Sequence, residues 1–147
     1  MGFWLRRGAI GLAIVLAASQ FVRPAMTNPP IEPGRTIHAY LPHPNAVAVI
    51  LDRSCRDCHA NSTVWPWYSH VAPVSWLVAH DVTDGREAVN FSEWGAYESA
   101  KQAKLLKEAC DEVKEGAMPP RIYTWMHPDA KLTGQDVETI CQVAAQP

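Results

Sequence analysis

The sequence predicts an all-α fold, with one small helical domain behind an apolar N-terminal segment. Three observations lead to this prediction. Apolar residues recur at helical spacing in several stretches of the chain, residues that favour helix ends flank those stretches, and no stretch shows strand-like alternation or an internal repeat. The 147 residues leave room for a single domain, because a domain takes about 100 to 200 residues.

The composition is that of an ordinary globular protein, with 48% hydrophobic and 19% charged residues. A net charge of −2 and a pI near 6.3 argue against a nucleic-acid partner, because binding phosphates requires a basic surface. The six Trp and twelve Pro residues occur in clusters. This clustering favours a cofactor pocket lined by aromatic rings.

Residues 1–25 are predicted to be a signal peptide or a membrane anchor. Arg6 and Arg7 precede an apolar run from Gly8 to Val22, which suits a signal peptide at least as well as a membrane span. The small residues at 17–19 make a poor cleavage site, so we favour an uncleaved anchor with both arginines in the cytoplasm. In either case we expect the rest of the chain on the periplasmic side of a bacterial inner membrane.

A proline-rich segment follows at residues 26–44. Proline blocks helix and favours extended chain, so the segment is predicted to be a stalk. The alternative is a segment that lies along the domain surface through Ile37, Tyr40 and Leu41, and the sequence leaves both open. The prolines in and just before this segment are Pro24, Pro29, Pro30, Pro33, Pro42 and Pro44.

The predicted domain spans residues 45–147 and begins with a helix. Asn45 is a good N-cap and precedes the apolar residues 46–51. We expect this helix to run into Cys55.

A second helix is predicted over residues 74–83, ending near Gly85. It places Trp76 and His80 four residues apart on one apolar face.

Two further helices have clear end signals. One runs from about Tyr97 to Glu115 and ends at Gly116, a usual C-cap residue. The other begins at Thr133, which forms a capping-box-like pair with Asp136. Their apolar stripes are Ala103, Leu106, Ala109, Cys110 and Val113, and Val137, Ile140, Cys141 and Ala144.

The sequence Cys55-Arg56-Asp57-Cys58-His59 is a C-x-x-C-H motif, which is typical of c-type haem attachment. On a helix, positions i, i+3 and i+4 share a face. The thiols of Cys55 and Cys58 are therefore expected to reach the two vinyl groups of one haem, while His59 reaches the iron.

A C-x-x-C pair also serves thiol redox chemistry and zinc binding. A thioredoxin-like site needs a βαβ setting that the sequence lacks, and a structural zinc site needs a second ligand pair, whereas Cys110 and Cys141 stand alone. The predicted export of the chain also favours haem, because c-type haem is normally attached outside the cytoplasm. We expect one covalent haem c.

Met118 is the predicted sixth iron ligand, because Met commonly completes a His-ligated haem iron in cytochromes c. It follows the third helix in a loop stiffened by Pro119 and Pro120. The alternative is that Met118 only fills a gap in the core. Competing ligands are His80, which is the strongest of them, and Met126, His127 and His70.

Aromatic and polar residues near the motif are candidate haem neighbours. Arg86 and Tyr123 are expected to donate hydrogen bonds to the haem propionates, since Arg matches carboxylates well. Five aromatic residues are expected either to wall the porphyrin or to be ordinary core, namely Trp65, Trp67, Tyr68, Trp76 and Trp94.

Cys110 and Cys141 are predicted to form a disulfide. Antiparallel packing of the last two helices brings them level, and an oxidising compartment permits the bond. The alternative is a pair of buried free thiols.

The chain resembles the bacterial cytochrome c-like haem-binding domain family over about Ile37 to Val143. The resemblance implies a helical c-type haem protein, often tethered by an N-terminal anchor, with haem bound through residues 55–59. The disulfide receives no support from it. The matching blocks are residues 55–59 with Asn61, Pro66-Trp67-Tyr68-Ser69, Gly85-Arg86, Asn90-Phe91-Ser92 with Trp94, Gly116-Ala117-Met118-Pro119, Tyr123, His127 and Leu132-Thr133.

We therefore expect a membrane-anchored mono-haem electron carrier that serves redox partner proteins in the periplasm or membrane. The sequence shows no evident catalytic nucleophile paired with a general base and no evident substrate cleft, so an enzyme is not expected. Two alternatives stay open. The first is a haem sensor or peroxidase-accessory domain with an exchangeable sixth ligand, and the second is a thiol or zinc module without haem.

Overall fold

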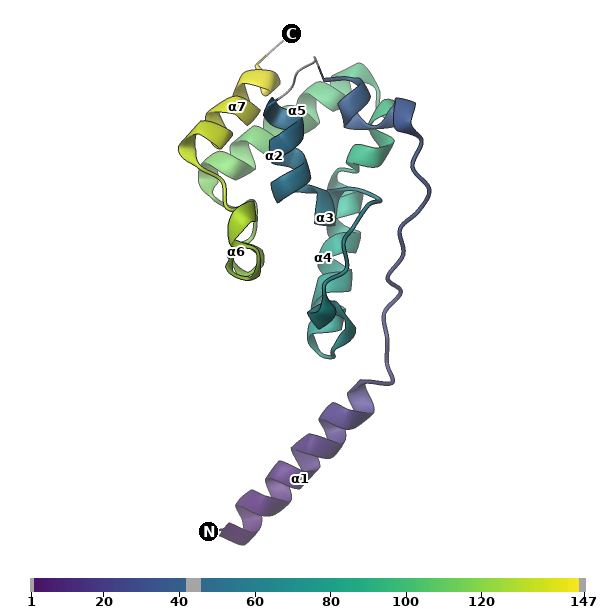
Figure 1. Ribbon diagram of the computed structural model, residues 1–147, viewed down its shortest axis with the longest axis vertical. Helices are drawn as coiled ribbons and strands as arrows, with labels where there is room; N and C mark the ends of the chain where they lie inside the picture. Colours follow the sequence, from purple (N-terminus) through teal and green to yellow (C-terminus); the bar gives the residue numbers. More distant parts are fainter. Residues whose placement is uncertain (1, 42–45, 146–147) are drawn as a thin grey trace.

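The computed structural model describes residues 2–41 and 46–145, and within these all the regular secondary structure is helical. The helix α1 (Gly2–Ser19) projects away from the rest of the molecule and buries none of its residues (Figure 1). An extended segment connects it to the domain. The predicted all-α fold is therefore confirmed.

The domain is built from longer helices joined by short 3-10 turns. The longer elements are α2 (Ala46–Ser54), α3 (Arg56–His59), α4 (Val74–Ala88), α5 (Ser99–Glu115), α6 (Arg121–Met126) and α7 (Gly134–Ala144). The 3-10 helices are η1 (Pro33–Arg35), η2 (Ile37–Ala39), η3 (Trp67–His70), η4 (Phe91–Ala96) and η5 (Pro128–Ala130).

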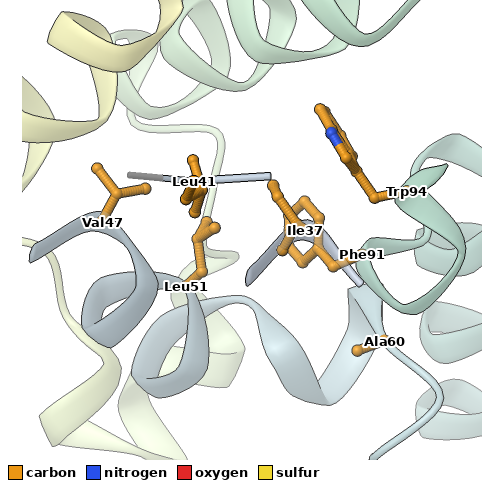
Figure 2. Close-up of a cluster of buried hydrophobic side chains, with 7 residues drawn as sticks. All are labelled: Ile37, Leu41, Val47, Leu51, Ala60, Phe91 and Trp94. Atoms are coloured by element: carbon orange, nitrogen blue, oxygen red, sulfur yellow. The ribbon is translucent and has the colours of Figure 1, made fainter. Parts of the chain in front are cut away.

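Helix α2 lies at the centre of the domain because its apolar residues face two clusters. Val47 and Leu51 pack in the larger cluster, shown in Figure 2, and Ile50 packs in the smaller one against Val113 and Ile140. The helix ends at Ser54, just before Cys55, as predicted. The predicted N-cap Asn45 lies outside the described residues. The larger cluster consists of Ile37, Leu41, Val47, Leu51, Ala60, Phe91 and Trp94.

The end of the described proline-rich segment packs on the larger cluster. Ile37 and Leu41 are buried in the larger cluster, and each fully buried aliphatic side chain contributes about 1.5 to 3 kcal/mol. Residues 37–41 therefore fit a segment packed on the domain surface, whereas residues 27–35 are exposed, and Pro42 and Pro44 lie outside the described residues.

Helices α5 and α7 pack together and are joined by a disulfide between Cys110 and Cys141, with a Cα–Cα distance of 4.9 Å. This confirms the predicted bond. The C-cap Gly116 has φ of 70°, and the capping box of Thr133 and Asp136 is present in full. Both predicted helix ends are therefore correct.

Helix α4 differs from the prediction in two ways. It continues through Gly85 to Ala88, because this glycine serves close packing and does not end the helix. Trp76 and His80 are both exposed, and His80 pairs with Asp84 at 3.3 Å. The expected apolar face through these two residues is therefore wrong.

Candidate functional site

The C-x-x-C-H motif forms a single helical turn. Cys55 stands between α2 and α3 with φ of −127° and ψ of −31°, so the two helices are separate. The backbone N–H of His59 still donates to the carbonyl of Cys55 at 3.0 Å. Cys55, Cys58 and His59 therefore keep the i, i+3 and i+4 relationship on which the prediction depends.

The imidazole of His59 is oriented by the backbone of α4. Its Nδ1 lies 2.8 Å from the carbonyl oxygen of Gly85 and 3.3 Å from that of Val89. A carbonyl oxygen only accepts, so Nδ1 carries the proton and Nε2 keeps its lone pair. Burial lowers the pKa of His59, although the two carbonyls act in the opposite direction. The side chain is thus a neutral imidazole with Nε2 as its electron-pair donor, which is the form that binds metals.

Cys55 and Cys58 are free thiols. Burial raises the pKa of Cys55 to about 12, with a further contribution from Cys58. Burial also raises the pKa of Cys58 to about 11, and the carboxylates of Asp81 and Asp57 add to the rise. Reactive redox cysteines have a lowered pKa because the thiolate is the nucleophile. These two thiols therefore do not suit thiol exchange chemistry.

Helix α3 packs closely on α4 at Gly85. A Cβ at this position would lie 2.6 Å from the carbonyl oxygen of Cys58 and 3.1 Å from its Cβ. Only glycine allows this approach, which also brings the Gly85 carbonyl within reach of His59. The glycine thus fixes both the packing of the motif and the orientation of its histidine.

A buried polar network fastens the chain just after His59. The Asn90 amide donates to Asn61 Oδ1 at 2.8 Å, and the Asn61 backbone N–H donates to Ser92 Oγ at 2.9 Å. Asn90 Oδ1 also accepts from the Ser92 backbone N–H at the start of η4. Because each of these groups finds a partner, the network stabilises this loop in one arrangement.

Arg86 holds three parts of the chain together. Its Nε donates to the carbonyl of Ala60 at 2.9 Å and its Nη1 to the carbonyl of Thr27 at 2.8 Å. Its Nη2 donates to Asn28 Oδ1 at 3.1 Å and to Thr63 Oγ1 at 2.8 Å. The predicted contact with propionates stays a prediction, whereas these protein contacts were not anticipated from the sequence.

An aromatic cluster connects α6 to the motif. Tyr123 donates to Asp57 Oδ2 at 3.0 Å and stacks on His127 with ring centroids 4.5 Å apart. His127 Nε2 and the Tyr68 hydroxyl share a hydrogen bond of 2.6 Å. Burial, followed by the Asp57 carboxylate, raises the pKa of both tyrosines, so both hydroxyls stay protonated at neutral pH.

A hollow of about 260 Å³ adjoins this cluster and is lined by Asp57, Tyr123 and His127 among others. The sequence indicated Tyr123 as a site residue but missed Asp57, which lies between the two cysteines of the motif. Neither Cys55 nor Cys58 lines this hollow or the second one, of about 160 Å³, which lies beside Leu51 and Phe91.

Met118 lies in the loop between α5 and α6, with its side chain 37% exposed. The backbone N–H groups of Ala117 and Met118 both donate to the carbonyl of Glu112, at 3.0 and 3.2 Å. These bonds hold the start of the loop on the last turn of α5. Among the competing ligands, His70, His80 and Met126 are exposed and His127 belongs to the aromatic cluster.

The predicted aromatic wall is dispersed in the structure. Trp67 is 75% exposed, whereas Trp94 is only 3% exposed and belongs to the core. Trp65 donates to Asn28 Oδ1, and Trp76 donates to the carbonyl of Val22. Within the described residues, Tyr68 alone of these five aromatics is hydrogen-bonded in the cluster beside the motif.

The donor set of the motif suits haem better than zinc. It offers two free thiols and one neutral imidazole whose Nε2 has no protein hydrogen-bond partner among the described residues. No group of three or more His, Cys, Asp or Glu residues suited to a metal ion occurs in residues 2–41 or 46–145. The zinc alternative therefore has no ligand cluster in this part of the chain.

Comparison with known proteins gives one match. The model of a family described as a haem-binding domain matches residues 14–146, which is most of the chain. No curated protein and no solved structure matches the chain. Together with a fitting donor set at Cys55, Cys58 and His59, this match identifies the chain as a member of the haem-binding domain family.

Proposed function

We propose that this protein is a mono-haem electron carrier in which Cys55 and Cys58 hold the haem covalently and His59 binds its iron. The observation that carries the proposal is the hydrogen bond from His59 Nδ1 to the Gly85 carbonyl. This bond selects the tautomer in which Nε2 is free to bind a metal, and it raises the basicity of the ligand.

Haem supplies an iron centre that exchanges one electron between its ferrous and ferric forms. The protein contributes the His59 ligand in a fixed orientation and a rigid structure around it. Packing of Gly85 on Cys58 and the Asn61 network hold the motif in place. A ligand that moves little between the two oxidation states favours rapid electron exchange.

Met118 is proposed as the sixth ligand. Bonds to the Glu112 carbonyl fix the start of its loop, and Pro119 and Pro120 limit the conformations of the rest. A thioether ligand raises the reduction potential of a His-ligated iron, as suits an electron carrier. We therefore propose an electron-transfer role and no catalytic activity.

The N-terminal helix supports a role at the membrane. Helix α1 is long and apolar enough to cross a bilayer by length and composition, although a signal sequence passes the same test. We propose that α1 is an uncleaved anchor and that the domain faces the periplasm. Its redox partners are then proteins of the periplasm or of the same membrane.

A pyridine haemochrome spectrum tests covalent attachment. The protein is produced in a host competent in cytochrome maturation, and its haem is extracted with acidified organic solvent. We expect the haem to stay with the chain and to give a c-type spectrum. The Cys55→Ser, Cys58→Ser double variant should lose covalent haem, whereas the matched Cys110→Ser, Cys141→Ser variant should keep it. A colourless wild-type protein with alkylatable Cys55 and Cys58 would refute the proposal.

Carbon monoxide separates electron transfer from the sensor or peroxidase-accessory alternative. The reduced holoprotein is titrated with carbon monoxide at neutral pH and followed by its absorption spectrum. We expect no binding, because Met118 occupies the sixth position. Rapid binding would favour the alternative with an exchangeable ligand.

A further inference from the structure

The end of α1 is bound to one edge of the domain. The side-chain amide of Gln20 makes two hydrogen bonds with Ala72, donating to its carbonyl at 3.1 Å and accepting from its N–H at 3.0 Å. The indole Nε1 of Trp76 donates to the carbonyl of Val22 at 2.7 Å. The first turn of α4 and the loop before it therefore contact the residues that follow α1, and in Figure 1 the start of α4 faces the end of α1.

The connecting segment is also held further along its length. Asn28 donates to the carbonyl of Thr63 at 2.9 Å, and Arg86 donates to the carbonyl of Thr27 and to Asn28 Oδ1. With the contacts of Gln20 and Val22, these bonds attach the segment to the domain at separate points. The domain thus has a defined orientation relative to the end of α1.

The edge next to α1 is apolar and exposed. We call it the apolar edge, and its side chains are between 40% and 90% exposed. They come from the end of the N-terminal segment, the loop before α4 and its first turn. The exposed Arg23, which follows Val22 and donates to the carbonyl of Gln20, borders this set. The members are Phe21, Val22, Val71, Val74, Trp76 and Leu77.

Helix α1 is at the short end of what spans a bilayer. Its 18 residues, Gly2–Ser19, rise by about 27 Å in a helix, whereas the hydrocarbon core is about 30 Å thick. A short span is accommodated by bilayer thinning or by flanking groups at the interface. Arg6 and Arg7 can extend to the headgroups at one end, and the apolar edge meets the bilayer at the other.

We propose that the apolar edge rests on the lipid surface of the bilayer that α1 crosses, with Trp76 at the level of the headgroups. This inference rests on the proposed anchor and adds a fixed orientation of the haem domain on the membrane. The apolar side chains of the edge extend the apolar surface beyond the end of α1. They thereby make up part of the difference between the length of α1 and the thickness of the hydrocarbon core. Tryptophan with one apolar and one polar side is enriched at this depth.

Lipid photocrosslinking tests the inference. The full-length holoprotein is reconstituted in phosphatidylcholine vesicles that contain a photoactivatable phospholipid, and adducts are mapped by mass spectrometry. We expect adducts on residues 71–77. The internal control is α6, where Ile122, Trp125 and Met126 are also apolar and exposed and which lies away from α1 in Figure 1. Equal labelling of both regions, or none on residues 71–77, would overturn the inference.

A Gln20→Ala variant tests whether the contact with α1 sets this orientation. Loss of two hydrogen bonds should reduce labelling of residues 71–77 by about tenfold. Gln135→Ala is the matched control, because this glutamine is exposed on α7 and its side chain makes no hydrogen bond among the described residues, so labelling should be unchanged. Unchanged labelling in Gln20→Ala would contradict the orienting role of this contact.

Two further measurements separate this inference from the proposed function. The intact mass shows whether α1 remains on the purified protein, and its loss would refute both the anchor and the apolar edge. The haemochrome spectrum reports haem attachment, and its result does not depend on the anchor or on the apolar edge. A c-type spectrum and an intact mass, combined with labelling away from residues 71–77, would overturn the inference alone.

Discussion

The backbone of Gly85 lies so close to Cys58 that a Cβ at position 85 would stand 2.6 Å from the Cys58 carbonyl oxygen. We predict that Gly85→Ala forces α3 away from α4, at a cost of about 1 to 3 kcal/mol in the free energy of unfolding. Denaturant unfolding of the holoprotein measures this loss. Gly134→Ala is the control, since a Cβ there meets nothing within 4 Å, and equal stability of the two variants would refute the explanation.

Replacement of Met118 by Ala should remove the sulfur-to-iron absorption band and allow the reduced protein to bind carbon monoxide. Met126→Ala should retain the band and exclude carbon monoxide, because Met126 lies on α6 and at 49% is more exposed than Met118 at 37%. Visible absorption and carbon monoxide titration check both variants. If the band persists unchanged in Met118→Ala, Met118 is not the ligand.

Tyr123→Phe removes one hydroxyl that donates to Asp57 and leaves the ring stacked on His127. We expect a loss of about 1 kcal/mol in the free energy of unfolding, since Asp57 still accepts from the Val64 N–H. Tyr40→Phe is the control, because its hydroxyl makes no hydrogen bond among the described residues. Thermal and urea unfolding should distinguish the two, and a neutral effect of Tyr123→Phe would rule out a stabilising bond.

The disulfide of Cys110 and Cys141 closes a loop with a sequence separation of 31 residues. In the chain-entropy treatment, the Cys110→Ser, Cys141→Ser variant should lose about 3 to 4 kcal/mol of stability. Denaturant unfolding measures this loss. Thiol titration of denatured, unreduced holoprotein should find no reactive thiol at these positions, and two reactive thiols would show that the bond is absent in solution.

The capping carboxylate of Asp136 should make stability depend on pH. The backbone N–H of Thr133 lowers the pKa of Asp136 in the folded protein, and the Thr133 hydroxyl and Arg53 add to this effect. A lowered folded pKa gives stability that is present above the unfolded pKa and is lost as pH falls through the folded pKa.

Asp136→Asn should therefore flatten the fall in stability between about pH 5 and pH 2. Glu138→Gln, on an exposed position of the same helix, should leave the profile unchanged. Urea unfolding at a series of pH values gives both profiles. If Asp136→Asn and the wild-type protein lose stability in parallel, the carboxylate does not contribute in the expected way.

Local signals explain what the sequence predicted well. The capping box at Thr133, the left-handed C-cap at Gly116 and the stripe containing Cys110 each depend on residues within two helical turns. The C-x-x-C-H motif is equally local, since its geometry follows from one turn. These features are encoded where they occur, so a single sequence reveals them.

Long-range contacts explain what the sequence did not predict. Asp57 and Tyr123 are separated by 66 residues, and Arg86 and Thr27 by 59. Contacts between residues so far apart along the chain leave no periodic pattern in the sequence. Helix α6 and the 3-10 helices are too short for periodicity to detect. Gly85 resembled a helix end because glycine has low helix propensity, whereas close packing explains its presence.

The four hydrogen bonds of Arg86 have a mechanical consequence. Its guanidinium joins Thr27, in the segment that follows α1, to Ala60, next to the proposed iron ligand His59. A displacement of this segment at Thr27 is therefore transmitted to the neighbour of His59 through the Arg86 side chain. The position of the segment after α1 and the position of the chain beside His59 are thereby coupled.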